Sequence, residues 1–88
     1  MEKTSYIFSE HANQQIAARN LNMQLIVDAI AAPDFIQEED GLTVYMKVVI
    51  EVQKSYLLRI FINKNKEPNV VVTVYKTSKI KKYYEGYL

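Results

Sequence analysis

The sequence lacks cysteine and tryptophan altogether, and it contains a single histidine, two glycines and two prolines. Without cysteine the chain has no disulfide bond, no thiol nucleophile and no cysteine ligand for zinc. The two glycines are isolated, which excludes a glycine-rich phosphate loop, and one histidine is too few for a multi-histidine metal site. We therefore expect neither a metal nor a cofactor, and the missing cysteine fits a cytoplasmic location.

Long apolar runs are also missing. No run approaches the roughly 20 residues of a transmembrane helix, and nothing resembles a secretory signal peptide, so we expect no membrane association. Hydrophobic residues nevertheless make up 49% of the 88 residues. Because a typical domain has about 100–150 residues, the sequence predicts one domain over residues 1–88, which the packing of its core must stabilise.

The two halves of the chain differ in charge, although the whole chain has a net charge of only +1. Residues 1–40 hold two basic and seven acidic residues, a net charge of −5, whereas residues 41–88 hold nine basic and three acidic residues, a net charge of +6. This asymmetry indicates a polyanion partner or association between unlike halves of two copies. A solvated basic surface without a partner explains it equally well.

The first third of the sequence predicts two helices, over residues 9–20 and 23–32. Ser9 suits the N-cap position of the first helix, with Glu10 in its first turn. Asn22 suits the N-cap position of the second helix, which Pro33 ends.

From residue 34 onward the apolar residues alternate, which predicts strands over residues 35–39, 42–52, 56–62 and 70–76. Asp40-Gly41 predicts a tight hairpin turn, and we place the next turn at residues 53–55. The tail, residues 77–88, is basic and aromatic and forms either a short helix or a frayed extension. Helices followed by strands predict an α+β fold, with the two N-terminal helices packed on an antiparallel meander of three or four strands.

The alternation also predicts which side of the sheet the helices cover. The more apolar side should be covered, and it carries Val44, Met46, Val48, Ile50, Leu58, Ile60, Ile62, Val70, Val72 and Val74. The other side would carry Thr43, Tyr45, Lys47, Arg59, Phe61, Thr73 and Tyr75. Because that side combines hydroxyls, aromatic rings and cations, we expect a functional site there.

This set of residues suits metal-independent cleavage of RNA by its own ribose 2′-hydroxyl. The reaction needs an acid, a base and donors for the charge that develops on the phosphate. His11 can supply acid–base chemistry, Arg19 and Arg59 can hold phosphate oxygens, and Thr73 and Tyr75 can donate hydrogen bonds. Further RNA contacts are expected from Tyr45, Lys47, Lys79 and Lys82, since tyrosines stack on bases and lysines bind phosphates.

Each of these side chains also has a purely structural interpretation. His11 near a helix start is more often solvated or capping than catalytic. Arg19, late in its helix, suits the helix dipole. Arg59 could pair with Glu51 across the sheet.

Two short motifs carry a family resemblance. His11-Ala12 opens a helix that Arg19 follows, and Val72-Thr73-Val74-Tyr75 ends an apolar strand. With these motifs the chain resembles, over roughly residues 6–77, a bacterial family known as domain of unknown function DUF4258. That family is similar to RelE-like and barnase-like ribonuclease toxins. The resemblance implies their fold, a toxin-type endoribonuclease activity, and His11, Arg19, Thr73 and Tyr75 as catalytic residues.

The sequence departs from the family pattern at two positions. Gln15 stands where the family has its first arginine, and Asn20 stands where it has glycine. Loss of the arginine removes a cation from the implied site. The alternative function is therefore a catalytically inactive member, of bacterial or phage origin, that binds nucleic acid or protein or acts as an inhibitor. The implied partners are RNA and a cognate antitoxin or immunity-type protein, and a homodimer is a third hypothesis.

Overall fold

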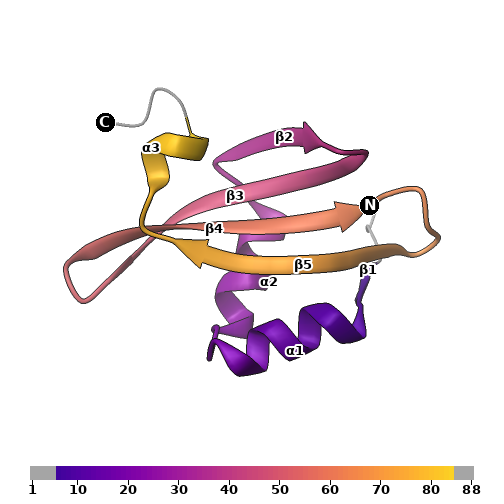
Figure 1. Ribbon diagram of the computed structural model, residues 1–88, viewed down its shortest axis with the longest axis horizontal. Helices are drawn as coiled ribbons and strands as arrows, with labels where there is room; N and C mark the ends of the chain where they lie inside the picture. Colours follow the sequence, from indigo (N-terminus) through magenta and orange to yellow (C-terminus); the bar gives the residue numbers. More distant parts are fainter. Residues whose placement is uncertain (1–5, 85–88) are drawn as a thin grey trace.

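The computed structural model describes residues 6–84, which form one sheet of five strands with three helices (Figure 1). In chain order the elements are β1 (Tyr6–Phe8), α1 (Glu10–Ala18), α2 (Met23–Ala31), β2 (Phe35–Glu39), β3 (Leu42–Glu51), β4 (Lys54–Asn63), β5 (Asn69–Thr77) and α3 (Ile80–Tyr83). Helix α3 lies within the predicted basic tail, whose residues 85–88 fall outside the described residues.

Side-chain caps fix where α1 and α2 begin. Ser9 Oγ accepts a hydrogen bond from the Ala12 amide (3.0 Å), and Asn22 Oδ1 accepts one from the Gln24 amide (2.8 Å). Each bond satisfies an amide that the first helical turn leaves without a backbone partner. Between the helices Asn20 takes a φ of 52°, a left-handed conformation that asparagine adopts more readily than most residues.

The strand order in the sheet is β1-β5-β4-β3-β2. Strands β2 to β5 pair antiparallel with their neighbours, whereas β1 pairs parallel with β5. The predicted architecture, two N-terminal helices on an antiparallel meander of three or four strands, is therefore wrong: the sheet is mixed, has five strands and carries a third helix. The alternation could not reveal β1, because three residues are too few to establish a period of two and its partner strand lies near the other end of the chain.

The predicted sides of β3 are also reversed. Val52 and Gln53, with φ angles of 47° and 65°, form a two-residue turn between β3 and β4, one residue shorter than the turn predicted from the sequence. A change of one residue in register moves every side chain of a strand to the other side of the sheet. Tyr45 therefore lies opposite Ile60 and on the same side, whereas Val44 and Met46 share the other side with Phe61 and Arg59.

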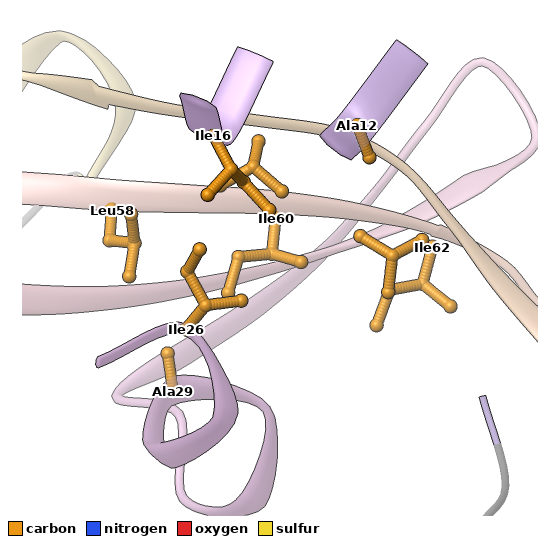
Figure 2. Close-up of a cluster of buried hydrophobic side chains, with 9 residues drawn as sticks. Ala12, Ile16, Ile26, Ala29, Leu58, Ile60 and Ile62 are labelled. Carbon is orange, nitrogen blue, oxygen red and sulfur yellow. The ribbon is translucent and has the colours of Figure 1, made fainter. Parts of the chain in front are cut away.

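The side of the sheet that faces α1 and α2, called here the α1–α2 face, carries the larger cluster of buried side chains (Figure 2). Figure 2 shows Ile16 and Ile26, one from each helix, directed toward Ile60 of the central strand β4. The buried members are Ala12, Ile16, Ile26, Ala29, Leu58, Ile60, Ile62, Val71 and Val74.

The opposite side, called here the α3 face, is covered by α3 (Figure 1). Its buried members are Val44, Met46, Leu57 and Ile80, and the partly buried Phe35, Val48, Phe61, Tyr83 and Tyr84 pack against them. Strand β3 thus contributes apolar side chains to both faces, as expected of a strand covered on both sides. Along residues 6–84, no helix has the length and apolar character to cross a membrane.

Candidate nucleic-acid interface

Arg59 lies at the centre of the α3 face and is only 2% exposed. Its Nη1 donates a hydrogen bond to Tyr75 Oη (2.5 Å), its Nε donates to Met46 Sδ (3.4 Å), and its Nη2 forms an ion pair with the Glu39 carboxylate. A buried cation needs such partners, because it has lost its hydration. A phosphate could reach the guanidinium only by displacing one of them.

Aromatic rings complete the surroundings of Arg59. The guanidinium carbon lies 4.2 Å from the centroid of the Tyr83 ring, 5.1 Å from that of Phe61 and 5.6 Å from that of Tyr75. Cation–π attraction to these rings adds to the ion pair. The structural interpretation of Arg59 as a partner of Glu51 is therefore corrected: Arg59 pairs with Glu39 of the edge strand β2.

Tyr75 and Tyr83 interact with each other beside Arg59, and their ring centroids are 6.5 Å apart. Burial raises the pKa of Tyr75 above its ordinary value of 10.0, although its hydrogen bond with Arg59 acts in the opposite direction. A hydrogen bond with Tyr75 lowers the pKa of Tyr83 below 10.0. Both phenols thus belong to one hydrogen-bonded cluster that holds α3 against the sheet.

A pocket of about 250 Å³ lies between α3 and the edge strand β2 and is lined by Phe35, Gln37, Lys82 and Tyr83. Gln37 Nε2 donates a hydrogen bond to Glu39 Oε2 (3.0 Å), so the amide is connected through Glu39 to Arg59. Phe35 and Tyr84 stack in parallel, with centroids 4.9 Å apart. The pocket therefore combines aromatic walls, an oriented amide and a cation.

A second pocket, of about 400 Å³, lies around α3 at the start of β4. It is lined by Ser55, Ser78, Lys79, Ile80, Lys81 and Lys82. Hydroxyl and ammonium groups are the donors that proteins commonly present to phosphate oxygens. The two pockets share Lys82, and none of the described residues that line them is acidic.

His11 and Arg19 lie on α1 and directly after it, and both are exposed. They flank Gln15 at helical spacing, so the three side chains follow one stripe of the helix. Gln15 Oε1 accepts a hydrogen bond from the Val74 amide (3.0 Å), which ties the middle of this stripe to β5. Gln15 is thus a structural link between α1 and the sheet.

Five of the predicted site residues lie on the α3 face or around α3. Arg59 and Tyr75 are paired across β4 and β5 and are hydrogen-bonded to each other. Thr73 pairs with Phe61 two residues along the same strands. Lys79 and Lys82 line the second pocket.

The other predicted site residues lie elsewhere. Tyr45 packs against the cluster on the α1–α2 face. Lys47 donates to the Ala32 carbonyl (3.0 Å) after the end of α2. Among the hydrogen bonds and ion pairs of residues 6–84, none joins His11 or the Arg19 side chain to Thr73 or Tyr75. The predicted residues are therefore divided between two sides of the sheet.

Sequence reasoning missed several residues of this surface, above all Gln37, Glu39 and Tyr83. The alternation within β2 contained a signal, because Phe35, Gln37 and Glu39 share one side of that strand. The contact between Glu39 and Arg59 joins residues of two strands that are not neighbours in the sheet, and no local pattern predicts it.

The family described as domain of unknown function (DUF4258) matches residues 8–76. The chain belongs to this family. The predicted family membership is thus confirmed, and the match extends from the end of β1 almost to the end of β5, leaving α3 outside it.

Comparisons with curated proteins and with solved structures find no significant match. The expected likeness to RelE-like and barnase-like toxins therefore has no support from a relative or a structure. The antitoxin or immunity-type partner, the homodimer and the cytoplasmic location stay predictions. Within residues 6–84, no group of three or more metal-ligating side chains comes together.

Proposed function

We propose that the protein binds single-stranded RNA on the α3 face. The observation that carries this proposal is the pair of adjoining pockets beside α3, one with aromatic walls and one with lysines and serines, which share Lys82. Proteins that bind single strands combine a cationic path for the backbone with aromatic rings for the bases. These pockets bring both kinds of group to one surface.

The charge around the second pocket favours an anionic ligand. Lys79, Lys81 and Lys82 follow one another along the short helix α3, and the hydroxyls of Ser55 and Ser78 lie beside them. Lys76, by contrast, is already paired, since its Nζ lies 2.6 Å from Glu51 Oε1. The lysines of the pocket have no ion-pair partner among residues 6–84, so they are available to phosphates.

Three features favour binding over cleavage. His11 lies on α1, which packs on the other side of the sheet from α3 (Figure 1). Arg59 is occupied by Glu39 and Tyr75. Gln15 accepts a hydrogen bond from β5 where the family has a cation. Acid–base catalysis needs its groups within hydrogen-bond reach of the reacting atoms, so these features support the interpretation as an inactive, RNA-binding family member.

Metal-independent cleavage by His11 is the second candidate, and one observation favours it. His11 and Arg19 are both exposed and follow one stripe of α1 beside β5. A phosphate bound between them would contact an acid–base group and a cation. In this case RNA would be cut in EDTA, and His11→Ala would abolish the cutting.

Binding can be tested by the fluorescence anisotropy of a labelled single-stranded RNA in EDTA. We expect the double variant Lys79→Ala/Lys82→Ala to weaken binding about tenfold, and to flatten its salt dependence between about 50 and 200 mM, because two phosphate contacts are lost. Lys64→Ala/Lys66→Ala, in the loop before β5, is the charge-matched control and should bind as the wild type does.

Two outcomes would contradict the proposal. Equal weakening by both double variants would mean that RNA responds to net charge and not to the pocket. Shortening of the RNA during the measurement, absent in His11→Ala, would replace the binding proposal with cleavage. An intact RNA on a denaturing gel supports binding alone.

A further inference from the structure

We propose that the pocket lined by Phe35, Gln37, Lys82 and Tyr83 holds one nucleobase of the RNA, and that Gln37 selects adenine. This inference rests on the proposed function and deepens it, because it names the base that the RNA site reads. Apart from Lys82, none of the residues that line this pocket was predicted from the sequence to contact RNA. The inference is based on the orientation of the side-chain amide of Gln37.

The orientation of the Gln37 amide follows from its partner. Gln37 Nε2 lies 3.0 Å from Glu39 Oε2, and that carboxylate also forms the ion pair with Arg59. An ionised carboxylate can only accept hydrogen bonds, so the atom of Gln37 that faces Glu39 must be the donating nitrogen. The buried Arg59 thus holds Glu39, and Glu39 fixes which way the amide points.

The remaining hydrogen-bonding groups of Gln37 suit a base edge. One N–H of the amide is used by Glu39, which leaves the second N–H as a donor and Oε1 as an acceptor. Oε1 takes no hydrogen bond from residues 6–84. An adjacent donor and acceptor of this kind form the two-bond pairing by which glutamine recognises adenine, through N6 and N7.

The size and walls of the pocket fit a single base. Its volume is about 250 Å³, which is below the roughly 300–1,000 Å³ of pockets for drug-sized ligands. Phe35 stacks on Tyr84 with one ring face, so a base would stack on its other face, and a purine has the larger ring system to do so. Lys82 belongs to both pockets, so a phosphate next to the bound base would lie toward the lysines and serines.

The test compares two labelled RNAs, a short uridine oligomer and the same oligomer with one central adenosine. We expect the wild type to bind the adenosine-containing RNA about tenfold more tightly, the lower end of what a two-bond base contact contributes. Gln37→Ala should abolish this preference, so that the two RNAs bind with the same affinity. Gln14→Ala, on the exposed side of α1, is the matched control and should keep the preference.

Each remaining outcome is decisive. If neither RNA binds, the proposed function fails and this inference fails with it. If both RNAs bind equally well to the wild type, the RNA-binding function stands and the adenine site is wrong. If the preference survives in Gln37→Ala, with a circular dichroism spectrum like that of the wild type, another group reads the base.

Discussion

The two sides of the sheet differ in how their polar residues are used. On the side of α1, His11 and Arg19 are exposed, and their side chains have no partner among residues 6–84, although they belong to the segment that the family match covers. On the α3 face, Arg59 is buried and fully engaged, and pockets surround a helix that the match does not reach. The motif residues His11 and Arg19 thus lie apart from the α3 face, whereas the motif residue Tyr75 belongs to it.

This difference shows that the type of a residue does not decide its role. Arg59 and Arg19 are both arginines, a residue type that binds phosphate. Only Arg59 is occupied, by the carboxylate of Glu39 and the ring of Tyr83. A buried arginine whose nitrogens all have partners orders its neighbours instead of binding a ligand. On the α3 face, Arg59 therefore positions Glu39, and through it Gln37.

The largest expected difference between the two faces is in the stability of their cores. Ile26 is 0% exposed between α2 and the sheet, whereas Ile80 is 5% exposed in a four-residue helix without a side-chain cap. We expect Ile26→Ala to lower the free energy of unfolding by about 4 kcal/mol and Ile80→Ala by about 2 kcal/mol, because a terminal helix can relax around the cavity. Urea denaturation would measure both, and a larger loss for Ile80→Ala would mean that the α3 face is the main core.

The next effect separates an ion pair whose cation is buried from one whose two side chains are both partly exposed. Glu39→Ala leaves the charge of Arg59 buried without its carboxylate, and we expect a loss of about 3 kcal/mol in the free energy of unfolding. Glu51→Ala breaks the pair with Lys76, whose side chains are 27% and 36% exposed, and should cost less than about 1 kcal/mol. Chemical denaturation of the two variants side by side is the measurement. Equal losses would show that burial does not distinguish the pairs.

The same contrast explains how much of the fold could be predicted from the sequence. Alternating apolar residues mark β2 to β5 well, because each is at least five residues long, and Ser9 and Asn22 mark the helix starts. Strand β1 leaves no such pattern. The sides of β3 depend on whether the turn at Val52 has two residues or three. The more apolar side, with Val44 and Met46, faces α3, so hydrophobicity alone pointed to the wrong side of the sheet.

The candidate site was less predictable than the fold. His11 and Arg19 were found by a local motif, but whether they meet Thr73 depends on how α1 packs on the sheet. The partner of Arg59 could not be found either, because Glu39 reaches it from a strand that is not its neighbour. Pairing across a sheet is set by register and side-chain length together, and neither is visible in a single segment of sequence.

A smaller effect is expected where α1 meets β5. Gln15→Ala removes the acceptor of the Val74 amide, and Val74 is 0% exposed. An amide left without a partner in such a place costs about 1–2 kcal/mol. We expect that loss in the free energy of unfolding, with faster hydrogen exchange at the Val74 amide. The neighbouring control Gln14→Ala should change neither quantity, and protection of Val74 that persists in Gln15→Ala would assign its amide to another acceptor.

The smallest effect concerns the two tyrosines of the α3 face, and it is a dependence on pH. Burial raises the pKa of Tyr75, so the folded protein keeps the phenol proton above pH 10, where the unfolded chain loses it. The contribution of Tyr75 to stability is therefore complete below pH 10.0 and declines as the pH rises further. The lowered pKa of Tyr83 has the opposite sign: its contribution grows as the pH rises from that pKa to 10.0.

The variants Tyr83→Phe and Tyr75→Phe should separate these contributions, because the pKa values of Tyr75 and Tyr83 are shifted by different causes. Tyr83→Phe should remove the rise below pH 10.0 and keep the decline above it, since burial of Tyr75 remains. Tyr75→Phe should remove both, because the hydrogen bond with Tyr75 is the main cause of the lowered pKa of Tyr83. The measurement is the difference in the free energy of unfolding between the wild type and each variant at several alkaline pH values, in which the other titrating groups cancel. A rise that persists in Tyr75→Phe would mean that the cations beside Tyr83, and not Tyr75, lower its pKa, and the hydrogen-bonded link between α3 and the sheet would then be absent.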